Sequence, residues 1–282
     1  MMISRRNFLM ATGAVGAAGL LAACGSKPAA SSTASSAAAS SVAASSEAAS
    51  TSAAAAELTT VEAGKLTMAT NAAFPPYEMT TDSGEIEGID VDTAQAIAEK
   101  LGLELQIDDM DFDAALLSVQ QGKADIVMAG VTVTDERKAV MDFSDSYATG
   151  IQSIIVPEGS DITSPDDLAG KKIGTQRGTT GYIYCSDDFG DDAVVAYDDG
   201  LTAVQALNNG QVDAVVIDNA PAKEFVAANP GLVILDTSYA EEDYAIGMAK
   251  GSALEDAVNK ALEELKADGT LQSIVDKYIT AE

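Results

Sequence analysis

The pattern of apolar and polar residues predicts alternating strands and helices from about residue 65 onward. Residues 66–70 form an apolar run of strand length, and a loop at 74–76 separates it from a helix that starts after Asp90. That helix ends at Gly102, a residue type that favours the left-handed turn after a helix. Its apolar residues recur at helical spacing, at Ala94, Ile97, Ala98 and Leu101.

The pattern continues through further elements and then repeats. Residues 103–107 alternate as a strand does, residues 113–121 have helical spacing, and residues 125–129 form a short apolar strand. The second half follows the same order, with strands at 172–175, 193–196 and 213–217 and helices from about 179 and at 201–209. The chain is therefore predicted to contain two strand-helix-strand-helix-strand units.

Two segments show the repeat most closely. A helix end, a glycine and an aspartate that opens an apolar strand occur at Gly122 and Asp125, and again at Gly210 and Asp213. Units of this kind build parallel sheets covered by helices, and ligands bind at the carboxyl ends of such strands. Two facing lobes thus predict a binding site in the cleft between them.

Charge limits the partners of the chain. It has 282 residues, with 16 basic and 44 acidic side chains and a net charge of −28. That length allows one or two domains with substantial cores. So acidic a chain repels nucleic acid and anionic lipid headgroups, and we expect neither to bind the folded part of the protein.

Missing residue types exclude several classes of enzyme. The chain has no histidine, which excludes a Ser-His-Asp triad, a histidine zinc site and a histidine general base. Cys24 and Cys185 are too far apart in sequence for a metal knuckle or a Cys-x-x-Cys redox pair. Neither Gly-x-x-x-x-Gly-Lys-Ser/Thr nor Gly-x-Gly-x-x-Gly occurs. We expect no cofactor and no metal, while catalysis by carboxylates stays open.

The first residues predict export. Arg5 and Arg6 precede an apolar stretch at 8–23 that is short for a membrane span. It ends in Leu-Ala-Ala before Cys24, which resembles a bacterial lipoprotein signal with the lipid on that cysteine. The arginine pair also resembles a twin-arginine signal, so the export route stays open. Removal of residues 1–23 leaves 14 basic against 44 acidic residues, a net charge of −30.

A tether is predicted after Cys24. Residues 26–56 are almost wholly alanine and serine without apolar periodicity, which is typical of a flexible spacer. A lipid on Cys24 leaves Cys185 without a partner, so Cys185 is expected to be a small buried apolar residue.

Four further blocks carry a family resemblance. They are Ala-Thr-Asn-Ala-Ala-Phe-Pro-Pro-Tyr-Glu at 69–78, Gly-Ile-Asp-Val-Asp at 88–92, Ala-Gly-Val-Thr-Val-Thr-Asp-Glu-Arg at 129–137 and Asp-Phe-Ser-Asp at 142–145. From about residue 65 to the end, the chain resembles the polar amino-acid family (family 3) of extracellular or periplasmic solute-binding proteins of ABC importers. Thr93 departs from the family pattern, since an aliphatic residue is usual there.

The resemblance implies an α/β fold of two lobes, each a mostly parallel sheet flanked by helices and joined by two hinge segments. The hinge segments are expected near 147–151 and 240–244. The expected divisions are a signal peptide at 1–23, the lipidated cysteine and tether at 24–64, the first lobe at 65–148 and 241–282, and the second lobe at 149–240. Ligand binding is expected to close the lobes by hinge rotation.

A buried amino acid needs a cation for its carboxylate and an anion for its ammonium. Arg137 is the candidate cation, although it lies third in a helix that starts after Thr134, where the helix dipole disfavours a cation. The alternative is a surface ion pair with a neighbouring acid, which the placement at the wrong end of the dipole disfavours. The resemblance makes Arg137 the carboxylate clamp, with Thr132 beside it.

The second lobe supplies the other predicted contacts. Residues 176–181 lie between a strand and a helix, where backbone N–H groups bind anions, although an ordinary glycine loop has the same pattern. The resemblance assigns Thr179 and Thr180 to the carboxylate, and Arg177 is expected to face solvent. Asp218 ends a strand and either caps the following helix or, as the resemblance implies, binds the ammonium together with the Gly130 carbonyl.

Side-chain selectivity is assigned to Asn71, Phe74, Phe112 and Gln176. The two phenylalanines resemble the aromatic pair that flanks the ligand side chain, and the alternative for them is plain core packing. Asn71 stands where relatives that bind basic or amide side chains often have an aspartate. The absence of that charge favours a polar uncharged or modestly apolar amino acid.

The sequence therefore predicts a non-enzymatic receptor, exported and lipid-anchored to the outer face of the cell membrane or to the periplasmic side of a two-membrane envelope. Its expected partners are a free amino acid and the permease subunits of an ABC importer, with the receptor itself a monomer and the membrane reached only through the lipid. The alternatives are a carboxylate-using dehydratase or lyase on the same fold, and a ligand-sensing module.

Overall fold

The first repeated unit forms a five-stranded sheet in a computed structural model that describes residues 58–279. Its strands run in the order β5 (Glu104–Asp109), β1 (Lys65–Thr70), β6 (Ile126–Val127), β14 (Gly247–Ala249) and β7 (Met141–Phe143). The strands predicted at 66–70, 103–107 and 125–129 correspond to β1, β5 and β6. A small antiparallel sheet adjoins them, formed by β2 (Ala73–Phe74), β3 (Glu78–Thr80) and β4 (Ile86–Glu87).

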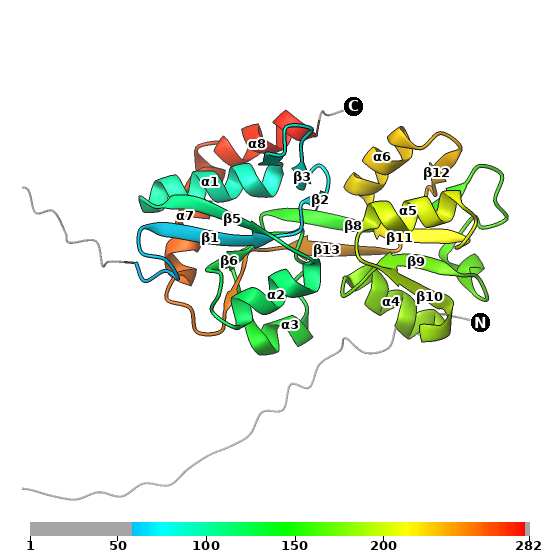
Figure 1. Cartoon of the computed structure of the whole chain (residues 1–282), viewed down its shortest axis with the longest axis horizontal. Coiled ribbons are helices and arrows are strands. Elements are labelled where there is room, and N and C mark those ends of the chain that lie inside the picture. Colours follow the sequence, from blue (N-terminus) through cyan, green and yellow to red (C-terminus); the bar gives the residue numbers. More distant parts are fainter. Residues whose placement is uncertain (1–57, 280–282) are drawn as a thin grey trace, which may run out of the picture. The chain divides into compact units, whose positions relative to one another are not determined.

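Alternate residues of β1 face different helices, as the period of a strand requires. Leu66 and Met68 pack in one cluster with α1 (Ile89–Leu101), α7 (Glu255–Ala267) and α8 (Thr270–Tyr278). Ala69 packs in another cluster, with α2 (Phe112–Gln120). The first sheet is thus covered on both faces (Figure 1).

The second unit forms a six-stranded sheet. Its order is β10 (Val194–Tyr197), β9 (Ile173–Gln176), β11 (Ala214–Asp218), β8 (Ala148–Pro157) and β12 (Leu232–Ile234), and β13 (Ala240–Tyr244) also pairs with β8. Helix α4 (Thr180–Phe189) covers one face, while α5 (Gly200–Asn208) and α6 (Asn219–Ala228) cover the other. Cys185 of α4 is fully buried in this core, which confirms its predicted environment.

Both sheets are mostly parallel in strand direction, as expected, and each contains one reversed strand, β14 in the first sheet and β8 in the second. The strands of the repeated units pair in parallel, β1 with β5 and β6, and β9 with β10 and β11. The other strands of both sheets pair antiparallel. β8 and β14 are reversed because the chain enters each of them after crossing from the other lobe. β7, β12 and β13 pair antiparallel only because their partner is β14 or β8.

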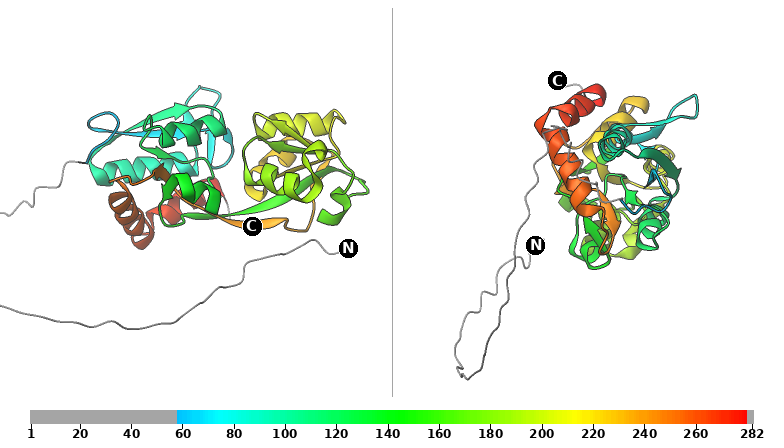
Figure 2. Two further views of the ribbon diagram at one scale, coloured as in Figure 1. Left: turned by 90° about the horizontal axis from the view of Figure 1, so that it is seen from below. Right: turned by 90° about the vertical axis from the view of Figure 1, so that its left-hand side faces the viewer.

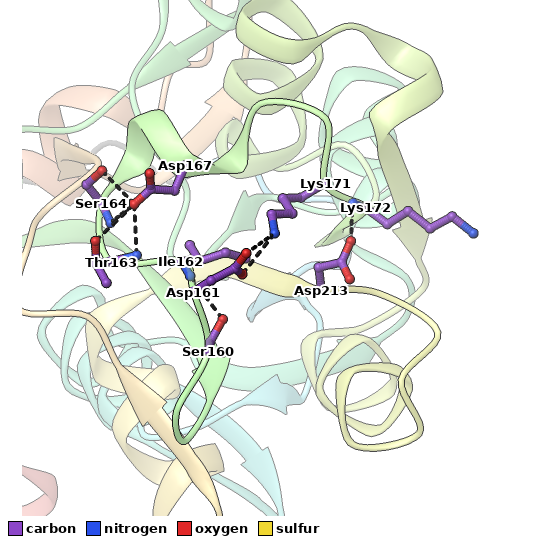
Figure 3. A network of polar contacts seen from close by, with 9 residues as sticks. All are labelled: Ser160, Asp161, Ile162, Thr163, Ser164, Asp167, Lys171, Lys172 and Asp213. Carbon is purple, nitrogen blue, oxygen red and sulfur yellow. Dashed lines mark hydrogen bonds and ion pairs between the residues drawn. The ribbon is translucent and has the colours of Figure 1, made fainter.

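The repeated glycine-aspartate pattern has a structural cause. Gly122 and Gly210 have φ angles of 66° and 67°, a left-handed conformation that favours glycine. The Asp125 carboxylate accepts the N–H of Thr67 at 2.7 Å, and the Asp213 carboxylate accepts the N–H of Lys172 at 2.7 Å. Each aspartate thereby ties the start of its own strand to the neighbouring strand, and Figure 3 shows the bond of Asp213 to Lys172.

Two adjacent strands connect the lobes. β8 and β13 pair antiparallel, with Ala148 opposite Tyr244 and Gln152 opposite Ala240. They contain the crossovers expected near 147–151 and 240–244 and run side by side between the two lobes (Figures 1 and 2). All described residues belong to one compact unit. The division of the chain at 148 and 240 stays a prediction.

The remaining elements are α3 (Asp135–Val140) and the short 3₁₀ helices η1 (Pro165–Leu168) and η2 (Asp191–Ala193). Within residues 58–279, no helix has both the length and the apolar character that a membrane crossing requires. The predicted signal peptide, Cys24 and most of the tether lie outside the described residues.

Candidate functional site

One cavity brings together every residue that the sequence assigned to a ligand. Its empty volume is about 430 Å³, and residues of both lobes line it. The predicted residues in its wall are Asn71, Phe74, Phe112, Gly130, Thr132, Arg137, Gln176, Thr179, Thr180 and Asp218. The other lining residues are Glu78, Ala129, Gln152, Val216 and Ile217.

Arg137 reaches the cavity from the first turn of α3. Thr134 caps this helix, since its hydroxyl accepts the N–H of Arg137 at 3.1 Å. The guanidinium donates from Nη1 to the Thr132 carbonyl at 2.8 Å and from Nη2 to the Gly178 carbonyl at 3.2 Å. Its Cζ lies 5.3 Å from the centre of the Phe112 ring. Arg137 is only 9% exposed, so it is not a surface ion pair.

Burial lowers the pKa of Arg137, and the nearby carboxylates of Glu242, Asp113 and Asp218 oppose that shift. An arginine stays protonated in proteins, so the cavity contains a fixed positive charge. Two of its five N–H groups have carbonyl partners, which leaves donors for an oxygen ligand.

The start of α4 faces this cation across the cavity. The Thr179 hydroxyl accepts the N–H of Tyr182 and donates to the Gln176 carbonyl at 2.8 Å, so it caps the helix. The amides of Thr180 and Gly181 belong to the first turn, where no carbonyl of the helix can accept from them. Arg177 is exposed, as expected for a solvent-facing residue, and its Nη2 lies 3.6 Å from Asp198 Oδ1.

Asp218 supplies a negative charge at the end of β11. It occupies the N-cap position of α6, but its side chain makes no capping bond. The carboxylate instead accepts from the Tyr244 hydroxyl and from Gln152 Nε2, the latter at 2.8 Å. Burial raises the pKa of Asp218 to about 7, and the neighbouring Glu242 adds to the rise, while the two hydrogen bonds oppose it.

Two further buried acids, Asp90 and Glu78, lie near Gly130. Asp90 accepts the Gly130 N–H at 3.0 Å and thereby fixes the backbone whose carbonyl was predicted to contact the ligand. Burial raises the pKa of Asp90 to about 6 and holds the pKa of Glu78, which is fully buried beside it, well above its usual range. Burial thus favours the uncharged form of Glu78.

An amide pair lies opposite the charged groups. Gln176 Nε2 donates to Asn71 Oδ1 at 2.8 Å, a bond between the two lobes, and Asn71 Nδ2 donates to the Met110 carbonyl at 3.0 Å. Phe74 and Phe112 are buried but line the cavity, so core packing does not account for them fully.

Sequence reasoning missed five polar residues of the site: Glu78, Asp90, Gln152, Glu242 and Tyr244. Glu78 and Asp90 lie inside the blocks that carried the resemblance, and Glu242 and Tyr244 lie in the predicted crossover. Glu241-Glu242-Asp243 reads in the sequence as three exposed acids, and the burial of Glu242 between exposed neighbours appears only in the structure.

Comparison with known proteins decides the family. Residues 66–281 match the model of bacterial extracellular solute-binding proteins, family 3. The chain belongs to this family. The L-cystine-binding protein TcyJ of Escherichia coli is 33% identical to it over 226 residues, which cover 78% of this chain and 85% of the relative.

Two solved structures of an ancestral arginine-binding protein are also similar to this family 3 chain. The structure bound to glutamine is 42% identical, with a TM-score of 0.74, and covers 77% of this chain and 99% of its own. The structure bound to arginine is 43% identical, with the same TM-score, and the match covers 77% of this chain and 98% of that structure's chain. The two-lobed α/β fold is thus confirmed. Family 3 proteins are extracytoplasmic receptors of ABC transporters, which are not enzymes, and this rules out the dehydratase reading.

Proposed function

We propose that this family 3 protein captures a free amino acid in the cavity between its lobes and delivers it to the permease of an ABC importer. The carrying observation is the pair of opposite charges, Arg137 from the first lobe and Asp218 from the second, buried in the wall of one cavity. Arg137 and the first-turn amides of α4 suit the α-carboxylate. Asp218 and the Gly130 carbonyl suit the ammonium.

The Asn71–Gln176 pair favours a polar uncharged side chain, of which glutamine is the clearest case. Two amides supply both donors and acceptors and carry no charge, so they match another amide without a counter-ion. The related structure with bound glutamine supports a ligand of this size and polarity. We therefore propose that glutamine binds more tightly than arginine.

A cationic side chain is the second candidate, and a specific observation favours it. Glu78, Asp218 and the adjacent Glu242 outnumber the single cation Arg137 around the cavity, and a related structure contains arginine. Against this, burial raises the pKa of Glu78 and so favours the uncharged form of that carboxyl, which attracts a cation less than a carboxylate does.

Calorimetric titration of glutamine and arginine separates the two candidates. In Asn71→Asp, the new carboxylate should strengthen arginine binding at least tenfold and change glutamine binding much less, because only the cationic side chain gains an opposite charge. Asn209→Asp adds the same charge at an exposed position and should leave both affinities unchanged. Tighter binding of arginine than of glutamine by the parent protein would establish the cationic reading.

We also propose that the protein is anchored through a lipid on Cys24. The proposal rests on the Leu-Ala-Ala-Cys sequence at 21–24 and the alanine-serine stretch that follows. Cys24→Ser should move the protein from the membrane fraction to the soluble fraction of expressing cells. Cys185→Ser changes the other cysteine, which is buried, and should leave the protein in the membrane fraction. Retention of Cys24→Ser in membranes would refute lipid anchoring.

A further inference from the structure

Glu242 is a buried acid on the strand β13 that joins the lobes. Only 5% of the residue is exposed, whereas its neighbours Glu241 and Asp243 point to solvent. Among the described residues, no lysine or arginine forms an ion pair with it. A carboxylate without a cation is costly to bury, so the hydrogen bonds that it accepts must stabilise it.

Three donors meet at one oxygen of Glu242. Its Oε2 accepts from Thr180 Oγ1 at 2.9 Å, from Gln152 Nε2 at 3.0 Å and from Thr132 Oγ1 at 3.2 Å. All three donor residues line the ligand cavity, while Glu242 itself lies behind them. The other oxygen, Oε1, is buried without a protein partner.

The donors come from different lobes. Thr132 lies in the loop after β6 of the first lobe, and Thr180 is the first residue of α4 in the second. Their hydroxyl oxygens are 3.4 Å apart, so both lobes must be close together for one carboxylate oxygen to serve both. Separation of the lobes removes at least one of these bonds and leaves the buried charge less satisfied.

The proton count of the hydroxyls sharpens this role. A threonine hydroxyl has one proton, and a proton donated to Glu242 is not available to a ligand carboxylate. Glu242 therefore fixes the orientation of both hydroxyls and leaves the ligand carboxylate to the N–H donors of Arg137 and α4. Gln152 Nε2 donates both to Glu242 and to Asp218. Through this shared donor, Glu242 also positions Asp218, the predicted partner of the ligand ammonium.

We propose that Glu242 is a positioning residue that joins Thr132 to Thr180 across the cleft and slows its opening. The effect on ligand release rests on the proposed function, whereas the effect on the lobes does not. Glu242→Gln keeps the shape of the side chain, but it removes the charge and one of the two acceptor oxygens. Glu241→Gln makes the same change one residue earlier, on the exposed side of β13.

Two measurements on these variants test the proposal. Spin labels at exposed Lys123 of the first lobe and Asp187 of the second, in a Cys24→Ser background, report the distance between the lobes without any added ligand. Stopped-flow kinetics with glutamine report association and release separately. We expect Glu242→Gln to shift the distances toward the open form and to speed release about tenfold, with little change in the association rate. Glu241→Gln should match the parent in both measurements.

The bond partner provides an independent check. Thr180→Val removes the hydroxyl, while Thr180→Ser keeps it, so only the valine variant should speed release. Combining Thr180→Val with Glu242→Gln should add little to either change alone, because both break one interaction. This serine-valine comparison also decides the question if Glu242→Gln does not fold.

The outcomes separate the two proposals. Parent-like distances and release in Glu242→Gln and in Thr180→Val would overturn the role of Glu242, even if glutamine binds. Failure of the parent protein to bind any free amino acid would overturn the proposed function, while the distance measurement would still decide the role of Glu242.

Discussion

Arg137 is a buried cation at the wrong end of a helix dipole, so its charge is disfavoured twice. Its carbonyl partners on Thr132 and Gly178 and the carboxylates nearby offset part of that cost. Helix stability would be served better by an acid at this position. The presence of Arg137 is therefore explained by ligand binding: its remaining N–H groups can form two hydrogen bonds to a carboxylate.

Replacement of Arg137 by lysine should test the shape of the cation as well as its charge. Lysine keeps the charge but loses the planar fork, so we expect amino-acid affinity to fall about tenfold, less than the about 2–5 kcal/mol that removal of the charge itself costs. Arg177→Lys is the matched control because Arg177 is exposed and pairs with Asp198 outside the cavity. Calorimetry that finds parent-like affinity in Arg137→Lys would remove Arg137 from the site.

Asp218 predicts a pH dependence of binding. The ligand ammonium binds the ionised carboxylate, whose pKa is about 7 in the folded protein. Affinity should therefore be complete above pH 8 and decline as the pH falls through 7, by about 30-fold at pH 5.5. The charged and titratable groups near Asp218 are Glu242 and Tyr244 of β13, Arg137 of α3, Tyr184 of α4, Glu78 of β3 and the adjacent Tyr77.

The same group should affect stability in the opposite direction. Because the pKa is raised on folding, the folded state holds the proton more tightly than the unfolded chain between about pH 4 and 7. The contribution of Asp218 to the free energy of unfolding thus decreases as the pH rises through that range. Asp218→Asn should abolish both trends in calorimetric titration and in urea unfolding. A pH dependence that persists in Asp218→Asn would assign it to Glu78 or Asp90.

At the scale of elements, the loop before α4 meets the start of α2. Gly178 has a φ of +73°, its carbonyl accepts from Arg137, and a Cβ placed on it would lie 1.7 Å from the Asp113 carboxylate. Glycine is favoured here for its backbone conformation and because a side chain would have to displace the Asp113 carboxylate of the other lobe. The contact exists only while the lobes are together.

Gly178→Ala should therefore obstruct closure. We expect amino-acid affinity to drop at least tenfold, because the methyl group collides with Asp113 of the opposite lobe. Gly210→Ala introduces a similar strain, at a φ of +67°, but into open space, so it should lower stability by about 1 kcal/mol and leave affinity intact. Equal affinities for the two variants in calorimetry would mean that the contact at Gly178 has no role in binding.

The elements themselves were largely predictable from sequence. Helical spacing and the glycines at 102, 122 and 210 placed α1, α2 and α5 within one or two residues, because local periodicity decides these boundaries. The antiparallel strands β7, β8, β12, β13 and β14 were not assigned. Their order depends on how the chain crosses between lobes, and a single segment carries no signal for that.

At the scale of the molecule, the cavity depends on residues that are far apart in sequence. Asn71 and Gln176 are 105 residues apart and Thr132 and Glu242 are 110 apart, yet each pair is hydrogen-bonded. The family resemblance located the ten lining residues that it assigns to ligands. It did not identify Glu242, Gln152 or Glu78, because their burial beside the site follows from the packing of both lobes against β8 and β13.

One measurement tests the central claim most directly: small-angle scattering of the purified protein with and without saturating glutamine, with thermal unfolding and mass spectrometry on the same samples. Binding across both lobes favours the closed form, so the radius of gyration should decrease. Ligand at a hundredfold excess over its dissociation constant should raise the free energy of unfolding by about 2.7 kcal/mol, and glutamine should be recovered unaltered. An unchanged radius of gyration with no stabilisation, for glutamine and for every other free amino acid, would contradict the account.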